Sequence, residues 1–228
     1  LYYRCGKGRH TQTGSSAMCA NHSKSALLYR QVRRALQSGR YLPGQRIDPG
    51  TLAEEFNTSP APVRFALHRL VGERLIDDHA RNGLHVPLLT EVALRELYDW
   101  MEHLLLRACE LGANATDGPP REPVGAALYS REDLVKGTWQ LFDAIAGASG
   151  FRPLHDAVKQ GNDRLAPVRR AKRGLIDHVG DELARLSGHW QNRDMPALKA
   201  AVHGYHARRK QLVPRIVAFL VDHRDRHL

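Results

Sequence analysis

Cysteine is scarce in this sequence of 228 residues: Cys5, Cys19 and Cys109 are too few and too scattered to form a disulfide scaffold. No apolar run approaches the roughly 18 to 20 residues that a membrane-spanning helix needs, and the N-terminus lacks the apolar core of a secretion signal. These absences favour a soluble protein of the reducing cytoplasm that has no membrane partner.

Catalytic patterns are also missing. The sequence shows no paired carboxylates on a cleft-like face, no arrangement of nucleophile and base, and no phosphate-binding loop. We therefore expect neither an enzyme nor a bound cofactor. An enzyme or cofactor carrier with an accessory N-terminal domain is the weaker alternative.

Positive charge, in contrast, is abundant and unevenly distributed. The formal net charge is +10, and residues 1–86 hold 13 Lys and Arg against 6 Asp and Glu, whereas the remaining residues hold 21 against 18. A basic N-terminal part suits a polyanionic target such as DNA, because phosphate contacts contribute much of the affinity for DNA. A generally solubilising surface charge is the alternative explanation.

Two short helices are predicted in the basic part. Asp48 and Pro49 form a typical helix start, and the helix that follows stops near Asn57. Thr58-Ser59-Pro60 opens a second helix by the same chemistry. One side of this second helix is apolar, through Val63, Leu67, Leu70 and Val71. The opposite side carries Ala61, Arg64, Phe65, His68 and Arg69.

The segment after these helices has the pattern of a two-stranded ribbon. Leu75-Ile76 and Leu84-His85-Val86 are short strand candidates, and Arg81-Asn82-Gly83 between them supplies a turn with Asn-Gly at its tip. Helix, turn, helix and ribbon in this order predict a winged helix-turn-helix, whose second helix enters a DNA groove.

The stretch LPGQRIDPGTLAEEFNTSPAPVRFALHRLVGERLI, followed by ARNGLHV, resembles the DNA-binding domain of the GntR transcription regulators over roughly residues 24–88. Members of that family place the second helix in the major groove and the wing in or beside the minor groove. The resemblance therefore implies DNA contacts from Ser59, Ala61 and Arg64 of the second helix and from Arg81, Asn82 and Gly83 of the wing. His68 and Arg69 lie on the same face of the second helix and are also predicted to contact DNA. Pro60 departs from the family pattern, which usually has a DNA-contacting Arg at this position.

The segments before this motif differ in character. Residues 1–22 are polar and glycine-rich without a helical or alternating pattern, so we expect a flexible or non-native extension, with residues 1–17 lying before Met18. This extension contains residue types that bind zinc, at Cys5, His10, Cys19 and His22, but their spacing matches no zinc site. An amphipathic helix is predicted over residues 24–37, so the winged domain spans residues 23–88.

Residues 89–228 predict an all-α antiparallel bundle of about six or seven helices, which makes the whole chain mainly α. A long helix capped by Thr90 runs to about Gly112, and the Pro- and Gly-rich residues 114–126 follow it. Further helices are predicted over residues 130–148, 152–173, 176–190 and 196–223. We expect a break in the second of these at Gly161 or Pro167, and a kink in the last at Pro214.

Fragments such as LRELYDWMEHLLLRACELGA and LFDAIAGASG resemble the FCD ligand-binding domain, which follows the DNA-binding domain in the FadR branch of GntR regulators. In many relatives this bundle holds a divalent metal, bound by an Asp and three His. The matching positions here are Thr138, Phe142, Leu183 and Tyr205, and Met101 stands where relatives often have an Arg. None of the four is a usual metal ligand, so we predict no metal.

The resemblance leaves these residues two roles. Met101, Thr138, Phe142, Leu183 and Tyr205 either line a pocket for a small apolar or aromatic effector, or fill the core of a bundle that binds no ligand. A shifted metal site would have to use other histidines, such as His155, His189, His203 or His206. Histidines that are exposed, or satisfied within the core, are the more frequent outcome.

Together these features predict a transcriptional regulator that acts as a homodimer on an inverted-repeat DNA operator. Repression is the commoner outcome in the family that it resembles, and the bundle would supply the dimer surface and effector control. The alternative is a winged domain that binds proteins, followed by a ligand-free structural bundle. Pro60 in place of the usual Arg favours that alternative.

Overall fold

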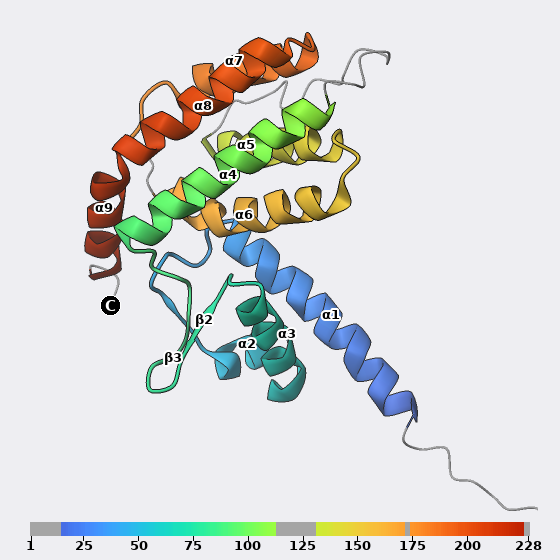
Figure 1. Ribbon diagram of the computed structural model, residues 1–228. Helices are drawn as coiled ribbons and strands as arrows, with labels where there is room; N and C mark the ends of the chain where they lie inside the picture. Colours follow the sequence, from blue (N-terminus) through green and yellow to red (C-terminus); the bar gives the residue numbers. More distant parts are fainter. Residues whose placement is uncertain (1–14, 113–130, 172–173, 226–228) are drawn as a thin grey trace, which may run out of the picture.

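The computed structural model describes residues 15–112, 131–171 and 174–225. Within these residues the chain is mainly helical, with nine helices and one three-stranded sheet (Figure 1). The helices are α1 (Ser15–Gln37), α2 (Pro49–Glu55), α3 (Pro60–Gly72), α4 (Glu91–Gly112), α5 (Arg131–Gly147), α6 (Arg152–Ala171), α7 (Val179–Gln191), α8 (Met195–Gln211) and α9 (Val213–Asp225). The strands are β1 (Arg46–Ile47), β2 (Asp77–His79) and β3 (Gly83–His85).

Helix α1 begins at Ser15, so the expectation of no helix before residue 23 is wrong for residues 15–22. A helix that is nucleated by packing elongates at little cost, and the added residues include the good helix formers Ala17, Met18 and Ala20. The packed half of α1 buries Leu28, Val32 and Leu36. Residues 1–14 lie outside the described residues.

The predicted start of α2 is confirmed. The Asp48 carboxylate accepts a hydrogen bond from the backbone N–H of Thr51 at 2.8 Å, which satisfies one of the unpaired amides of the first turn. The same hydrogen bond lowers the pKa of Asp48. Ser59 occupies the equivalent position before α3 but makes no capping hydrogen bond with its side chain. Its hydroxyl group is therefore not used to hold the helix.

The wing differs from the predicted ribbon in its first strand. Leu75 and Ile76 are not in a strand; they follow α3 closely, with the Leu75 N–H donating to the Leu70 carbonyl at 2.9 Å and Arg74 in the left-handed region at φ 57°. This arrangement is a Schellman-type helix end, and it turns both apolar side chains into the core. The strand consequently begins two residues later, at Asp77.

The sheet also contains a strand that the sequence analysis did not predict. Strand β1 pairs with β3 on the side opposite β2, with Ile47 across from Leu84, so the order is β1-β3-β2. At the tip of the wing, His79 pairs with Gly83, the Asn82 N–H donates to the His79 carbonyl at 3.0 Å, and Gly83 has φ 77°. A three-residue hairpin of this kind requires a residue with positive φ, and glycine adopts it without strain.

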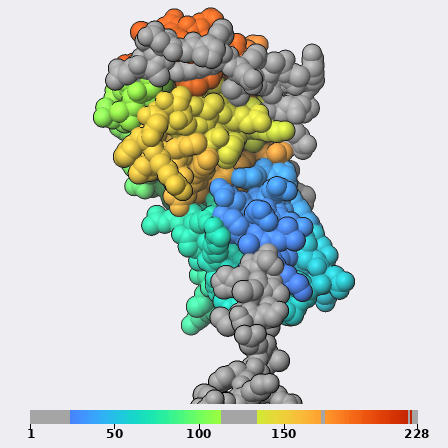
Figure 2. All heavy atoms as spheres, turned by 90° about the vertical axis from the view of Figure 1, so that its right-hand side faces the viewer, coloured from blue at the N-terminus to red at the C-terminus, as the bar shows by residue number. Residues whose placement is uncertain are grey.

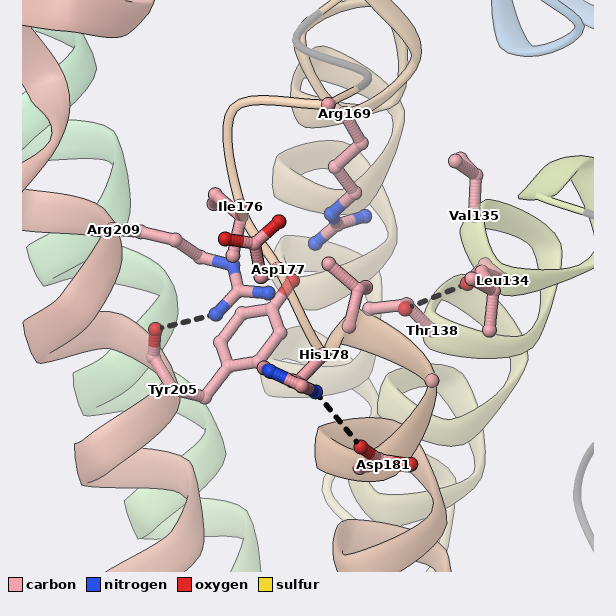
Figure 3. A pocket seen from close by; sticks show the side chains of 13 residues that line it. Leu134, Val135, Thr138, Arg169, Ile176, Asp177, His178, Asp181, Tyr205 and Arg209 are labelled. Atoms are coloured by element: carbon pink, nitrogen blue, oxygen red, sulfur yellow. Dashed lines mark hydrogen bonds and ion pairs between the residues drawn. The ribbon is translucent and has the colours of Figure 1, made fainter.

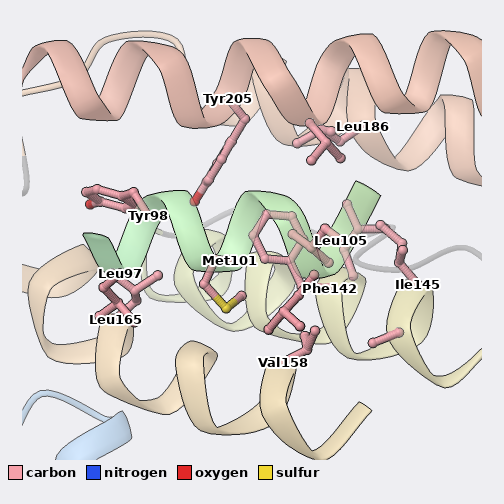
Figure 4. Packing of buried hydrophobic residues seen from close by; sticks show 14 of the residues in the cluster. Leu97, Tyr98, Met101, Leu105, Phe142, Ile145, Val158, Leu165, Leu186 and Tyr205 are labelled. Carbon is pink, nitrogen blue, oxygen red and sulfur yellow. The ribbon is translucent and has the colours of Figure 1, made fainter. Parts of the chain in front are cut away.

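Six helices, α4 to α9, form the bundle, and α4 runs through its middle between α8 on one side and α5 and α6 on the other (Figure 1). Thr90 caps α4 as predicted, because its hydroxyl accepts from the Ala93 N–H at 3.2 Å. Figure 4 shows Leu105 and Met101 of α4 facing Phe142 of α5 and Val158 of α6 in the buried core. The winged domain has its own cluster of buried hydrophobic residues, the first of which along the chain is Leu28 and the last Val86.

Helix α6 contains no break, contrary to the expectation at Gly161 or Pro167. Gly161 instead lies where α6 crosses α4, and a Cβ atom placed on it would be 2.2 Å from the Met101 Sδ. The glycine therefore serves close helix packing rather than helix termination.

The last predicted helix is two helices. Helix α8 ends at Gln211, and Pro214 stands in the first turn of α9, where its missing N–H costs nothing. The carbonyl of Lys210 would have needed the N–H that Pro214 lacks, and it accepts from the Arg95 guanidinium of α4 at 3.0 Å instead. Proline thus ends α8 instead of bending it. Helix α7 also starts later than predicted, at Val179, after His178 in the left-handed region.

The winged part and the bundle touch along the C-terminal half of α1 and one side of α6 (Figures 1 and 2). Asp163 of α6 is the centre of this contact: its carboxylate accepts from Arg33 and Gln37 of α1 and from Trp139 of α5. The Asp163 side chain is only 1% exposed. A buried carboxylate with three donors from both parts fixes how they meet.

Candidate DNA-contact surface and bundle cavity

The outer side of α3 carries an exposed row of side chains, as the helical spacing predicted. Ala61, Arg64, Phe65, His68 and Arg69 are exposed, whereas Val63, Leu67 and Leu70 are buried. Ser59 is exposed at the N-terminal end, where Pro60 and Pro62 have no N–H and Ala61 supplies the amide hydrogen of the first three helix positions. The geometry suits a helix whose outer face meets a phosphate backbone.

Two of the predicted contact residues, Arg64 and Arg69, differ in how free they are. Arg64 forms no ion pair within the described part of the chain, so its guanidinium is available to a ligand. The Arg69 guanidinium lies 4.0 Å from the centre of the Tyr29 ring and 3.3 Å from the Glu73 carboxylate. Arg69 is therefore turned along α3 toward α1, although 60% of its side chain is exposed.

The tip of the wing presents the other predicted contacts. Arg81 and Asn82 are exposed, and Gly83 is half-buried at the end of β3. Arg46 of β1 is exposed beside them, with its Nε 3.9 Å from the position that a Cβ on Gly83 would occupy. A cation next to the wing tip can reach a narrow minor groove or its phosphates.

Two exposed residues near the predicted contacts, Phe65 and Arg46, were not themselves predicted to contact DNA. Phe65 is 73% exposed in the middle of the α3 face, and apolar side chains in the major groove contact thymine methyl groups. The pattern of α3 already put Phe65 on that face, so its position was predictable although its role was not assigned. Arg46 had no such signal, because the pairing of β1 with β3 brings it to the wing.

The bundle contains a cavity of about 270 Å³ between α5, α6, α7 and α8 (Figure 3). Of the five residues predicted to line a pocket, Thr138 and Tyr205 lie in its wall. Met101, Phe142 and Leu183 lie in the packed core instead, at 0%, 0% and 3% exposure (Figure 4). The structure thus brings the five residues into one region, and only two of them face open space.

Two arginines that the sequence analysis missed lie in the same wall. Arg169 of α6 and Arg209 of α8 are 6% and 2% exposed. Arg209 donates to the Glu182 carboxylate at 2.6 Å and lies 3.2 Å from the centre of the Tyr205 ring. A signal for Arg209 existed in the sequence, since it follows Tyr205 by four residues and so shares its helix face.

The histidines considered for a shifted metal site each have a different environment. His155 binds Asp143 at 2.7 Å, His203 binds Glu102 at 2.6 Å, and His206 is buried with its Nδ1 2.8 Å from the Val202 carbonyl. His189 borders a different hollow, between α7 and α8. Across residues 15–112, 131–171 and 174–225, no three His, Cys, Asp or Glu side chains gather closely enough to hold a metal ion. The absence of metal stays a prediction.

No helix in the described ranges combines the length and the apolarity that crossing a bilayer requires.

The sequence of the winged part matches the model of the bacterial regulatory proteins of the gntR family over residues 24–86. A helix-turn-helix transcriptional regulator of Bacillus subtilis, YdhC, is 32% identical over 166 residues, which cover 68% of this chain and 72% of YdhC. The similarity to YdhC therefore extends well beyond the winged part into the bundle.

Solved structures share the whole arrangement. E. coli McbR/YncC aligns with a TM-score of 0.67 at 18% identity, over 84% of this chain and 97% of that one. A transcriptional regulator of the GntR type from Rhodococcus sp. RHA1 aligns with a TM-score of 0.69 at 16% identity, again over 84% and 97%. At these identities the likeness concerns the fold. The exposed face of α3, the wing and the extent of the match to YdhC lead to one conclusion: this chain belongs to the GntR family of DNA-binding, helix-turn-helix transcriptional regulators, which are not enzymes.

Proposed function

We propose that the protein is a homodimeric repressor of the FadR branch, in which residues 23–88 bind an inverted-repeat operator and residues 89–228 form an FCD-type domain that joins two copies and senses a small effector. The observation that carries the proposal is the exposed face of α3. Ser59, Ala61, Arg64 and His68 are open to a ligand on that face, while the other side of the helix is buried.

The proposed contacts divide by chemistry. Arg64 lies one turn from the helix start, within reach of a guanine edge or a phosphate, and the Ser59 hydroxyl with the Ala61 N–H would bind a phosphate. His68 would add a further polar contact from α3. Arg81, Asn82 and Gly83 would follow the minor groove from the wing, and the exposed Arg46 strengthens the positive charge there. Arg69, turned toward Tyr29, would reach a phosphate only after leaving Glu73.

Effector control is supported by the contact between the two parts. Asn162 holds the cavity-lining Arg169 through a hydrogen bond of 3.0 Å, and the next residue, Asp163, binds Arg33 of α1. Arg33 also donates to the Tyr29 hydroxyl, which donates to Glu73 directly after α3. A ligand that moves α6 would thereby change the position of the DNA-contact helix.

The test is a gel-shift titration with the DNA upstream of the protein's own gene. Arg64→Ala should weaken operator binding by about 1 to 3 kcal/mol and leave the molecular mass of the protein in solution unchanged. Arg152→Ala is the matched control, because the Arg152 side chain is 91% exposed on the bundle, and it should bind DNA like the natural protein. Equal affinity of the Arg64 variant and the natural protein would refute the assignment of α3.

The exposed Phe65 also fits a second function, in which the winged domain binds a protein. The same titration separates the two functions. Binding to DNA that is selective for sequence and weakens steeply with salt supports the repressor, whereas binding that ignores sequence supports the protein-binding module.

A further inference from the structure

The two arginines in the wall of the bundle cavity are not fully satisfied by the protein. Arg169 donates through Nη1 to the Asn162 side chain, but its Nε and Nη2 are buried without a hydrogen-bond partner among the described residues. The Nε of Arg209 is also buried without a hydrogen-bond partner among the described residues. Buried guanidinium nitrogens without an acceptor are expensive, so each calls for an explanation.

The positive charge of the cavity also exceeds the negative charge buried with it. Glu182 is the buried carboxylate of this region, and it accepts from both Arg208 and Arg209. Arg169 has no carboxylate partner in the described part of the chain, and its guanidinium lies 5.5 Å from the centre of the Phe142 ring. Asp177 and Asp181 also line the cavity, but both are exposed at its rim, where solvent weakens their influence.

The position of the unpaired nitrogen atoms on Arg169 indicates which kind of ligand they would bind. Nε and Nη2 form one edge of the Arg169 guanidinium, which is the edge that binds two oxygens of a carboxylate or phosphate at once. Figure 3 shows the Arg169 and Arg209 guanidinium groups and the hydroxyl end of Tyr205 pointing into the same space. Apolar side chains also line the cavity, namely Leu134, Ile176 and Val179.

We infer that this cavity binds a small organic oxyanion, whose acidic head group lies between Arg169 and Arg209 and whose apolar body packs on Leu134, Ile176 and Val179. This inference rests on the proposed effector role of the bundle and gives the effector a chemical class. A volume of about 270 Å³ suits a molecule of the size of a substituted benzoate. The arginines bind the head group directly, so the site requires no metal ion.

The experiment is thermal unfolding of the full-length protein with four probes: benzoate, phenyl phosphate, benzamide and inorganic phosphate. The acidic aromatic probes should raise the unfolding midpoint by about 3 °C or more at saturation, and uncharged benzamide should not. A larger shift with benzoate than with phenyl phosphate identifies a carboxylate head group, and the reverse order identifies a phosphate. If inorganic phosphate stabilises the protein as strongly as phenyl phosphate does, the proposed apolar contacts of the ligand are wrong. If no acid shifts the unfolding midpoint, the whole inference is wrong.

A substitution of Arg169 tests whether this residue is responsible for the shift of the unfolding midpoint. Arg169→Met should abolish the stabilisation by the acids while keeping or raising the midpoint of the ligand-free protein, because it removes an unsatisfied charge. Arg152→Met on the exposed end of α6 should respond like the natural protein. A ligand-free midpoint that falls by about 3 °C or more in the Arg169 variant would show that this arginine stabilises the fold instead, and would overturn the inference.

A second variant avoids the packed arginine altogether. Ile176→Glu places a carboxylate in the half-buried wall and should weaken the response to both acids by electrostatic repulsion. If the acids stabilise this variant as strongly as the natural protein, Ile176 does not contact the ligand. These measurements need no DNA, so loss of operator binding by Arg64→Ala and loss of acid binding by Arg169→Met can succeed or fail independently.

Discussion

His206 shows how far a single residue can be moved from its usual behaviour. It is fully buried, stacked on the Phe142 ring at 5.9 Å and close to the Tyr205 ring at 4.9 Å. Burial lowers its pKa to about 3, and the positive charges of Arg209 and Arg169 act in the same direction. His206 is therefore neutral near pH 7, with its Nδ1 donating to the Val202 carbonyl.

This environment gives the stability of the protein a definite pH dependence. The unfolded chain binds a proton at His206 near pH 6.5, but the folded protein does not, so acidification stabilises the unfolded state. The free energy of unfolding should fall by up to about 1.4 kcal/mol per pH unit below pH 6.5 because of this residue. Denaturant titrations at pH 7, 6 and 5 should show a shallower fall for His206→Phe.

The control for that slope is His103→Gln, since His103 is exposed on α4. It should keep the full dependence on pH. Glu102 and Glu182 have lowered pKa values, mainly through hydrogen bonds and charges from Lys210, His203, Arg208 and Arg209 that outweigh their desolvation. Their contribution is lost only below about pH 4.5, outside the measured window. If the free energy of unfolding falls equally steeply with pH in the natural protein and in the His206 variant, His206 is not the source of the pH dependence.

Two residues mark the limit of prediction at this scale. Arg64 was predicted on an open helix face and lies there, because the helical repeat alone decides which side is buried. Arg69 was predicted beside it, and the structure turns it toward Tyr29, forty residues earlier in the chain. Arg33 of α1 likewise binds a distant residue, Asp163 of α6. Contacts of this kind depend on the packing of distant helices, which local periodicity does not contain.

At the scale of helices, two glycines should respond oppositely to the same substitution. Gly161→Ala places a methyl group against Met101, which has no exposed surface and so little room to move, and should destabilise the protein by about 1 to 3 kcal/mol. Gly188→Ala in α7 meets no atom within 4 Å and should stabilise the helix by about 0.5 to 1 kcal/mol. Denaturant unfolding at neutral pH measures both, and equal effects would contradict the close crossing of α6 and α4.

The helices were predictable where their own residues determine their ends. Asp48 and Thr90 cap α2 and α4 through atoms that lie three residues away along the chain. One helix kinked at Pro214 was predicted where the structure has α8 and α9, because Arg95 of α4 satisfies the carbonyl that Pro214 leaves free. The cavity was only half predicted for the same reason: Arg169 looks like a surface cation in the sequence, but in the folded protein its guanidinium is buried beside Phe142 of α5.

At the scale of the whole molecule, the outer surface of α4 supports the proposed homodimer. Trp100 is 54% exposed and Val92 is 66% exposed on this helix. Trp100→Glu should weaken dimerisation by about 2 kcal/mol or more, because buried tryptophans dominate many interfaces. Light scattering during size-exclusion chromatography over a range of protein concentrations measures the change. An unchanged mass at every concentration would place the dimer surface elsewhere.

The contact at Asp163 has a consequence for how such a regulator responds. Asn162 and Asp163 are neighbours in one turn of α6, so the segment that holds the cavity-lining Arg169 also holds α1, which contacts the end of α3 through Tyr29 and Glu73. Energetic coupling between two binding sites is reciprocal: if the oxyanion lowers the affinity for the operator, the operator lowers the affinity for the oxyanion by the same factor. Protein molecules bound to an operator would then bind the acid only at a higher acid concentration than free protein molecules need. The affinity of each operator for the protein would therefore set the acid concentration at which its gene is released.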